Sequence, residues 1–408
     1  MVYLIAKKTG HSFSPLIHKE FGRYEYKTRE LNEDELDDFF KKKEFSGLNV
    51  TTPYKTTVMK YLDEISPEAM KIGAVNTIVN RDGKLIGYNT DKLGFSYTLE
   101  SSNIVIEGKD VLVIGAGGAS KAVVAAFEKF SPKSVRVLTH SENIPEKIEK
   151  YLDAQIIINT TPVGMFPNNY ASPIELEKFT KAEAVFDVIF NPAKTRLLLD
   201  AHHNGIPYFN GLRMLVAQAK AGCELFSGMP VDDREIERIH DLISEKTQNV
   251  TLVGMPGCGK TSVGRYVAEK LGKSFVDTDE EICSIGRSPA EIITNDGEKF
   301  FREIESEVVK KCGQKSGCVI ATGGGVVTRL ENYDPLFQNG IIFFIDRDIS
   351  LLATKGRPLS SGGIDKLKKL YEERLPLYER FSHFRIDGND DITAVGDKII
   401  AILEELKR

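Results

Sequence analysis

The segment Gly254-Met-Pro-Gly-Cys-Gly-Lys-Thr261 has the spacing G-x-x-x-x-G-K-T and constrains the fold more than any other feature of the chain. An apolar run at Asn249–Val253 precedes it, and an amphipathic run at Thr261–Leu271 follows it. A strand, a glycine turn and a helix in that order gather backbone N–H groups at a helix start, where they can hold a phosphate. A coincidental glycine turn would not need that context. The sequence therefore predicts a phosphate-binding loop in an α/β domain.

Composition limits the classes of protein to which the chain can belong. Its 408 residues are too many for one hydrophobic core, and 41% hydrophobic with 28% charged residues is ordinary for a globular protein. A net charge of −5 argues against a nucleic-acid partner, and no apolar run approaches the roughly 18 residues that span a bilayer. Five cysteines without C-x-x-C spacing predict neither a zinc cage nor a disulfide framework. We expect a cytoplasmic protein with small-molecule partners and no nucleic acid or membrane partner, and the sequence leaves a homo-oligomeric state open.

Short β-branched runs alternate with amphipathic runs, a pattern typical of α/β proteins with largely parallel sheets. One group of expected strands comprises residues 2–6, 45–51 and 74–79, with a helix expected from residue 32 and a turn at 80–84 that predicts an antiparallel pair. A second group comprises residues 110–115, 134–138, 155–158 and 184–189. An amphipathic segment at 231–243 ends in the polar residues Ser244–Asn249, where we expect the seam before the phosphate loop.

The first strand of the second group runs into a glycine turn, Gly115-Ala-Gly-Gly-Ala119, and then into an expected helix. Gly115 suits a tight turn, and the next two glycines leave room for a pyrophosphate against helix N–H groups. Ser120 replaces the last glycine of the common fingerprint, so the pattern alone leaves a dinucleotide site open. The following strand ends in Thr139-His-Ser141 without the acid typical of NAD sites, which favours NADP.

Hydride transfer to a carbonyl also requires a proton donor. Lys55, in Asn49-Val-Thr-Thr-Pro-Tyr-Lys55, and Asp91, in Gly87-Tyr-Asn-Thr-Asp91, are candidates for a pair that passes a proton and binds a hydroxyl. Taken singly, a surface lysine and a helix-capping aspartate are the alternatives.

Chemistry-bearing residues also follow the phosphate loop. Phe275-Val-Asp-Thr-Asp279 reads as a strand that ends in two carboxylates on one side of the chain, of which one can orient Mg²⁺ and the other can accept a proton from an attacking hydroxyl. A solvated strand end is the alternative. Arginines at 302, 357 and 374, together with a glycine triplet at 323–325, suit a small acceptor that carries a carboxylate.

This ordered set resembles shikimate kinase from Asn249 to the C-terminus. The resemblance implies that shikimate is held by Asp279, Arg302, Gly323, Gly324, Gly325 and Arg374, with Asp279 beside the reacting 3-hydroxyl. It implies that ATP is bound by Gly257, Cys258, Gly259, Lys260, Thr261 and Ser262, that Thr261 and Asp277 hold Mg²⁺, and that Lys260 and Arg357, the lid arginine, take part in catalysis. The chain departs from the family in two ways: it has no adenine-stacking arginine ahead of Arg357, and its lid is shorter. Lys355 is a partial substitute for the missing arginine.

Residues 1 to about 245 resemble shikimate dehydrogenase in seven ordered segments: Ser12–Pro15, Asn49–Lys55, Gly73–Thr77, Asn89–Asp91, Gly115–Ala119, Asn159–Met165 and Gly211–Gln218. The resemblance makes Lys55 and Asp91 the catalytic pair. It assigns substrate binding to Ser12, Ser14, Thr51, Lys55, Asn76, Asp91, Phe190 and Gln218, and NADP binding to Gly115, Ala116, Gly117, Gly118, Ala119, Thr139, His140, Ser141, Val188 and Gly211. Two departures are the absence of an arginine at Thr139–Ser141 and a phenylalanine, Phe190, where tyrosine is common.

Together these features predict an α/β chain with a two-lobed dehydrogenase, an α/β substrate lobe plus a Rossmann NADP lobe, followed by a P-loop kinase domain with a parallel sheet. We expect the substrate lobe at 1–93 and 211–245, the Rossmann lobe at 94–210 and the kinase at 246–408. The expected activity is NADPH-dependent reduction of 3-dehydroshikimate to shikimate, followed by MgATP-dependent phosphorylation of the 3-hydroxyl. Alternatives are an NAD-using quinate/shikimate dehydrogenase fused to the kinase and an inactive metabolite sensor.

Overall fold

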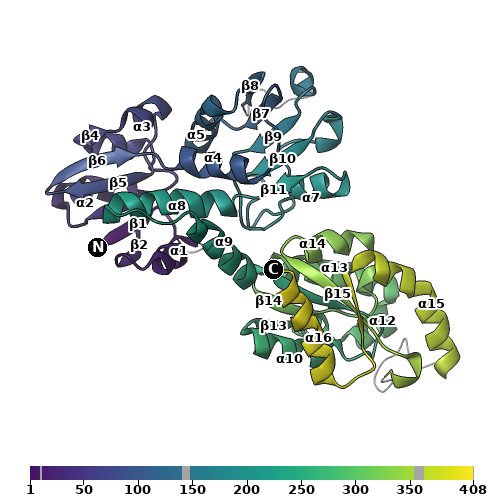
Figure 1. Ribbon diagram of the computed structural model, residues 1–408. Helices are drawn as coiled ribbons and strands as arrows, with labels where there is room; N and C mark the ends of the chain where they lie inside the picture. The colour runs from purple at the N-terminus through teal and green to yellow at the C-terminus, as the bar shows by residue number, and fades with distance from the viewer. Residues whose placement is uncertain (10–11, 140–147, 353–362, 408) are drawn as a thin grey trace. The chain divides into compact units, whose positions relative to one another are not determined.

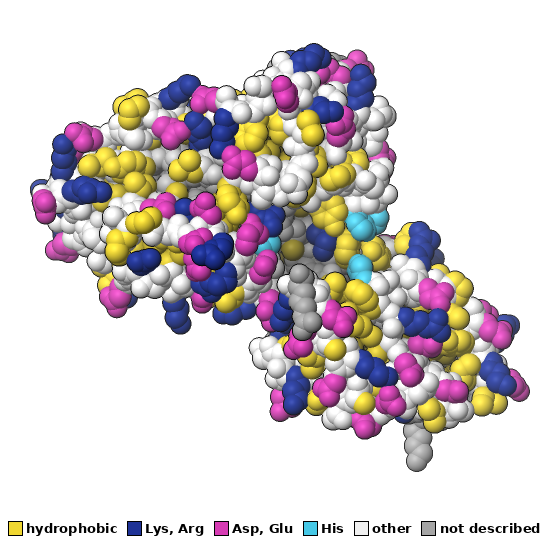
Figure 2. All heavy atoms as spheres, viewed as in Figure 1, with side chains coloured by type: hydrophobic (Ala, Val, Ile, Leu, Met, Phe, Trp, Pro, Cys, Tyr) yellow, Lys and Arg dark blue, Asp and Glu magenta, His cyan; other side chains and the backbone are white. Residues whose placement is uncertain are grey.

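The computed structural model describes residues 1–9, 12–139, 148–352 and 363–407 (Figure 1). The chain divides into two compact units, which we call the first unit (Met1–Asn191 with Thr195–His240) and the second unit (Pro192–Lys194 with Asp241–Arg408). No helix among the described residues is long and apolar enough to cross a membrane. On the face shown in Figure 2, Lys and Arg side chains are interspersed with Asp and Glu side chains.

The first unit contains a six-stranded sheet in the order β2-β1-β3-β5-β6-β4. Strands β1, β2 and β3 are parallel, whereas β5 pairs antiparallel with β3 and β6, as the turn signal at 80–84 predicts. The sheet packs on aromatic and aliphatic side chains of α2. Its elements are β1 (Val2–Ala6), α1 (Ser14–Phe21), β2 (Tyr26–Glu30), α2 (Leu36–Lys42), β3 (Gly47–Val50), β4 (Glu64–Ile65), α3 (Pro67–Ile72), β5 (Thr77–Arg81) and β6 (Lys84–Tyr88).

The second sheet of the first unit is entirely parallel, in the order β11-β10-β9-β7-β8. Its central strands are buried on both faces, which explains their continuous apolar sequence. Leu112 and Ile114 of β7 pack with α7 on one face, and Val111 and Val113 pack with α4, α5 and α8 on the other. The elements are α4 (Asp91–Ser101), β7 (Asp110–Ile114), α5 (Gly118–Ala126), β8 (Ser134–Leu138), β9 (Ile156–Asn159), β10 (Ala184–Asp187), α7 (Arg196–His203), β11 (Tyr208–Phe209) and α8 (Leu212–Ser227).

Helix α9 (Arg234–Thr247) leads directly to β12 (Asn249–Val253). The polar residues Ser244–Asn249, where the sequence predicts a seam, are therefore the last turn of a helix and the start of a strand, with only Gln248 between them. The reason is that the apolar positions of α9 continue through Ile243, which is fully buried, and Thr247 closes the helix by donating its hydroxyl to the Ile243 carbonyl at 2.8 Å.

The second unit has a fully parallel five-stranded sheet in the order β13-β14-β12-β15-β16. The central strand β12 enters the phosphate loop, so strands flank that loop on both sides. The elements are α10 (Lys260–Leu271), β13 (Ser274–Asp277), α11 (Thr278–Cys283), α12 (Pro289–Asp296), α13 (Glu298–Gln314), β14 (Cys318–Ala321), α14 (Tyr333–Phe337), β15 (Gly340–Asp346), α15 (Gly363–Phe381), β16 (Phe384–Asp387) and α16 (Ile392–Glu405).

Candidate active sites in the two units

A cavity of 240 Å³ lies in the first unit where the glycine turn, the start of α4 and the start of α8 converge. Ten of the residues expected to bind substrate or NADP line it: Ser14, Thr51, Lys55, Asn76, Asp91, Ala119, Val188, Phe190, Gly211 and Gln218. Leu4, Asn49, Val50, Met214 and Leu215 complete the wall. The cavity thus collects side chains that are far apart in the sequence.

Lys55 and Asp91 form an ion pair inside this cavity, with Nζ 2.6 Å from Oδ2. The two side chains are only 18% and 9% exposed, so the ammonium is not a solvated surface group. Asp91 is the first residue of α4, but the N-cap is Thr90 and no side-chain cap bond is made. The alternative of a capping aspartate is therefore wrong, because the carboxylate turns away from the helix to the cavity.

A buried hydrogen-bond network fixes the Asp91 carboxylate. Asn76 Nδ2 donates to Asp91 Oδ1 at 2.8 Å and to Thr90 Oγ1 at 3.0 Å, while the Asn76 oxygen accepts from the Thr90 N–H at 2.8 Å. The Thr90 hydroxyl in turn lies 3.3 Å from Gln218 Oε1. With one oxygen held by Asn76, the other is directed at Lys55, so the ammonium has a defined position.

Sequence reasoning missed Asn49, which lines the same cavity. Its Oδ1 accepts from the Tyr26 hydroxyl at 2.9 Å, and its Nδ2 donates to Thr77 at 3.3 Å. The available signal was a buried polar residue in an apolar strand. Ser12 is not among the lining residues, but its hydroxyl accepts from the Ser14 N–H at 3.2 Å and so shapes the loop that carries Ser14.

The glycine turn between β7 and α5 has the geometry that a pyrophosphate needs. Gly115 has φ +113°, and a Cβ there would stand 2.6 Å from Thr160 Oγ1, so only glycine fits. A Cβ on Gly117 would meet nothing within 4 Å, which leaves the start of α5 open to a ligand. Gly118 faces Lys55, whose Cδ would be 3.7 Å from an added Cβ. Of the expected phosphate-clamping residues, His140 and Ser141 lie outside the described residues.

Asp187, at the end of β10, is a buried acid near this cavity. Burial raises the pKa of its carboxyl to about 7, although hydrogen bonds from Ile189 N–H, Asn159 and Thr195 act in the opposite direction. Because the folded-state pKa exceeds the unfolded value, its contribution to the free energy of unfolding is present below pH about 4 and is lost as the pH rises to about 7.

We therefore expect the stability of wild type, measured relative to that of Asp187→Asn, to fall as the pH rises from 4 to 7, by up to about 4 kcal/mol. Urea unfolding of the first unit, followed at several pH values, measures this difference. The exposed turn residue Asp82, replaced by asparagine, is the matched control and should follow wild type. Parallel stability curves for wild type and Asp187→Asn would contradict the assignment.

The second unit contains a cavity of 500 Å³ at the phosphate loop. Its lining includes the expected residues Gly257, Gly259, Lys260, Thr261, Ser262, Asp277, Asp279, Arg302, Gly323, Gly324, Gly325 and Arg374. Cys258 is not among them and is 1% exposed, so only its backbone can serve a ligand. Arg357 lies outside the described residues. The cavity therefore joins the phosphate loop to the ends of β13 and β14 and to α13 and α15.

The two expected carboxylates reach this cavity by a route that differs from the prediction. Strand β13 ends at Asp277, and Asp279 lies in the first turn of α11. Asp277 caps that helix, because its side chain accepts from the N–H groups of Asp279 and Glu280. The expectation that both carboxylates share one side of a strand is wrong, since capping starts a helix between them. Both side chains still line the cavity.

Lys260 and Thr261 begin α10, whose N-cap Gly259 has φ +100°. Lys260 Nζ donates to the carbonyls of Gly254 and Met255 at 2.8 and 3.0 Å, and the Thr261 hydroxyl lies 2.7 Å from Asp277 Oδ2. A hydroxyl and a carboxylate side by side at a helix start are oxygen ligands of the kind Mg²⁺ prefers. The residues present therefore fit a magnesium–nucleotide complex.

At the other end of the cavity, two arginines surround the glycine triplet. Arg302 Nη1 pairs with Glu305 at 2.7 Å, and Arg374 Nη1 donates to the Gly324 carbonyl at 3.0 Å. A Cβ on Gly325 would stand 2.0 Å from Arg302 Nη2, so a side chain at that position would displace the guanidinium. Glycine at position 325 thus leaves the space that the Arg302 guanidinium occupies.

Glu305 is a further cavity residue that sequence reasoning did not single out. It is fully buried, and its Oε1 has no partner among the described residues. Burial raises the pKa of its carboxyl, whereas the Arg302 guanidinium acts in the opposite direction. The available signal was its spacing, one helical turn after Arg302, which lets the carboxylate orient the guanidinium.

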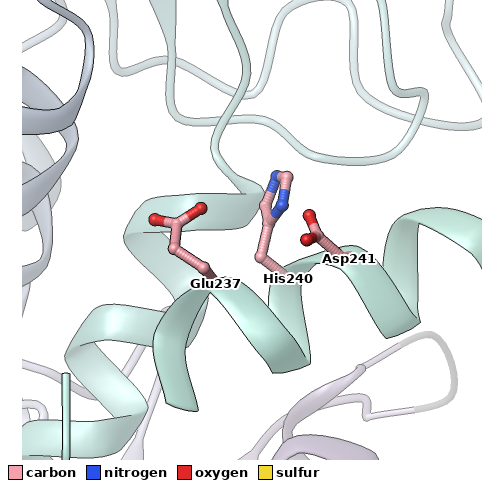
Figure 3. Close-up of side chains that lie close together, drawn as sticks. All are labelled: Glu237, His240 and Asp241. Carbon is pink, nitrogen blue, oxygen red and sulfur yellow. The ribbon is translucent and has the colours of Figure 1, made fainter. Parts of the chain in front are cut away.

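One cluster of possible metal ligands lies outside both cavities, on α9 (Figure 3). Ligand atoms of Glu237, His240 and Asp241 lie within 4.8 Å of one another. Both oxygens of Glu237 already accept from Arg213, and one also accepts from Tyr97. The carboxylate is therefore committed to an ion pair, and the cluster does not make a metal site.

Comparisons with known proteins agree with this geometry. Residues 4–78 match the shikimate dehydrogenase substrate binding domain. The chain is 35% identical over 271 residues to the shikimate dehydrogenase (NADP(+)) of Bacillus cereus, which covers 60% of this chain and 97% of that protein. The chain belongs to the shikimate dehydrogenase family.

Residues 256–404 match the shikimate kinase family, so the chain is a bifunctional enzyme, a shikimate dehydrogenase joined to a shikimate kinase domain. Solved structures of the dehydrogenase family cover the corresponding part. The chorismate mutase/shikimate 5-dehydrogenase fusion protein of Clostridium acetobutylicum is 36% identical with a TM-score of 0.55, covering 60% of this chain and 97% of that one. The shikimate 5-dehydrogenase of Thermus thermophilus, in complex with NADP(H) and shikimate, is 30% identical with a TM-score of 0.53, covering 59% and 97%.

Proposed function

We propose that the first unit reduces 3-dehydroshikimate to shikimate with NADPH. The buried Lys55–Asp91 pair beside the glycine turn carries this proposal. NADPH supplies the hydride. Lys55 donates a proton from Nζ to the carbonyl oxygen that becomes the new hydroxyl, and Asp91, held by Asn76, keeps the ammonium directed at that oxygen. Polar side chains around the cavity, including Ser14, Thr51 and Gln218, bind the other hydroxyls and the carboxylate of the substrate.

The second unit, we propose, phosphorylates the 3-hydroxyl of shikimate with MgATP. ATP supplies the phosphoryl group, and Mg²⁺ supplies positive charge that offsets the negative charge of the phosphates. Asp279 accepts the proton of the attacking hydroxyl, while Lys260 and the N–H groups at the start of α10 stabilise the transferring phosphate. Arg302 and Arg374 bind the acceptor carboxylate from the wall opposite the phosphate loop. Thr261 and Asp277 are the residues that would hold the metal.

The domain division that goes with these roles is a substrate lobe at 1–93 and 211–245, a Rossmann lobe at 94–210 and a kinase domain at 246–408. The separate buried clusters on the first and second sheets of the first unit support two lobes there. The position of Lys55 in one lobe against Gly118 in the other supports a reduction site between them.

Wild-type protein incubated with 3-dehydroshikimate, NADPH and MgATP should oxidise NADPH and form shikimate 3-phosphate. Without MgATP, shikimate should accumulate instead, and shikimate supplied alone with MgATP should still be phosphorylated. Chromatography of the products with absorbance at 340 nm as the NADPH readout measures both steps. A parallel incubation with NADH tests the alternative of an NAD-using quinate/shikimate dehydrogenase. Absence of both NADPH oxidation and phosphorylation would overturn the proposal.

A further inference from the structure

The second unit has another cavity, of 720 Å³, on the side of the phosphate loop away from the acceptor residues. Residues at the carboxyl ends of β15 and β16, together with α15, line it. The order β13-β14-β12-β15-β16 explains this separation, since β12 carries the phosphate loop, while Asp279 follows β13 and the glycine triplet follows β14. A molecule extending from the phosphate loop away from Asp279 must pass the ends of β15 and β16.

Arg347 lies beside the phosphate loop, on the side of the 720 Å³ cavity. It directly follows β15 and lines the 720 Å³ cavity. Its Nη1 is 3.9 Å from the position that a Cβ on Gly259 would occupy. Gly259 is the N-cap of α10 and lines the 500 Å³ cavity at the phosphate loop. The guanidinium therefore lies against the loop whose N–H groups hold an anion.

Arg347 has no counter-charge among the described residues. Its Nε is buried without a partner. The two neighbouring acids are engaged elsewhere: Asp346 accepts from Arg385 and Tyr371, and Asp348 accepts from Ser350. A half-buried cation without an anion loses hydration and gains nothing in return, unless a ligand supplies the anion. Arginine forks match phosphate oxygens in charge and geometry.

We propose that Arg347 binds the polyphosphate of the nucleotide from the β15 side, opposite the acceptor. This inference deepens the proposed kinase function and rests on it. Lys260 and the N–H groups at the start of α10 bind the phosphates within the loop. Arg347 adds a second cation from the β15 side, which faces the nucleotide and not the acceptor. It therefore sets nucleotide affinity while leaving acceptor affinity unchanged.

Isothermal titration calorimetry of the full chain with MgADP, and separately with shikimate, tests this role. Arg347→Gln should weaken MgADP binding by about tenfold or more, because a charge-assisted contact is lost. Arg347→Lys, which keeps the charge but not the fork, should bind MgADP with an affinity between those of wild type and Arg347→Gln. Shikimate affinity should stay within twofold in both variants. Arg380→Gln removes an exposed arginine of the same unit that lines neither cavity and serves as the matched control.

MgADP affinity of Arg347→Gln within twofold of wild type would overturn the proposal. A loss of shikimate affinity in Arg347→Gln as large as the loss of MgADP affinity would also overturn it, because the guanidinium would then serve the acceptor as well as the nucleotide. Unchanged shikimate affinity of the same samples, and an unchanged unfolding temperature, exclude misfolding of the second unit as the cause of a loss. If wild type binds MgADP but does not phosphorylate shikimate, the proposed function fails while the affinity ratio still decides the role of Arg347.

Discussion

Replacing Lys55 with alanine should lower kcat for NADPH-dependent reduction by about 10²- to 10⁴-fold, the range expected when a positioned proton donor is removed. The physical reason is that arriving hydride leaves negative charge on the substrate oxygen, and the ammonium 2.6 Å from Asp91 is the cation placed to neutralise it. The alanine variant also leaves the Asp91 carboxylate buried without its counter-ion. Stopped-flow or steady-state absorbance at 340 nm measures the rate.

The same variant provides its own control, because phosphorylation of added shikimate by the second unit should be unchanged. Lys60→Ala is the matched substitution, since Lys60 is 61% exposed at its side chain and pairs with the exposed Asp37. It should reduce 3-dehydroshikimate at the wild-type rate. A Lys55→Ala variant that keeps a rate within fivefold of wild type would remove Lys55 from the mechanism.

Replacing Lys260 with alanine should lower phosphoryl transfer by about 10²-fold or more, the scale of losing one preorganised donor to a developing charge. Lys260 begins α10, and its side chain is held against the loop by the Gly254 and Met255 carbonyls. It is therefore positioned before any ligand arrives, and its removal costs charge stabilisation at the transferring phosphate. With all substrates present, this variant should accumulate shikimate.

Lys270→Ala is the matched control for this second variant, because Lys270 lies on the same helix and is exposed. Reduction by the first unit should proceed at the wild-type rate in both proteins, and an unchanged unfolding temperature of the second unit shows that this unit is folded. Formation of shikimate 3-phosphate by Lys260→Ala at a near-normal rate would mean that the phosphate loop does not serve this reaction.

Local sequence determined the two anion-binding turns. In each, a strand, closely spaced glycines and a helix follow one another within a few residues, so covalent connection alone brings the N–H groups together. The buried strand β7 and the glycine with φ +113° after it, Gly115, could be predicted for the same reason. The antiparallel β5–β6 pair is equally local, since residues 80–84 make its turn.

Capping lies at the limit of such reasoning. Residues 275–279 favour a strand by composition, yet the chain turns into α11 at Thr278 because Asp277 satisfies two N–H groups of the first turn. Alternation along a strand therefore gave the wrong path for Asp279. Similarly, Asp91 stands at a helix start and reads as a cap, but Asn76 and Lys55 bind its carboxylate more completely than the helix does.

Only the tertiary structure decided which distant side chains share a cavity. Lys55 and Asp91 are 36 positions apart, Asn49 and Glu305 carry only a weak local signal, and Arg347 carries none. Sheet order and helix packing bring them together, and these depend on burying apolar faces across the whole unit. Motifs could be read from the sequence because their geometry is set by bonds along the chain, whereas the remaining contacts arise from packing between segments that the chain order does not place side by side.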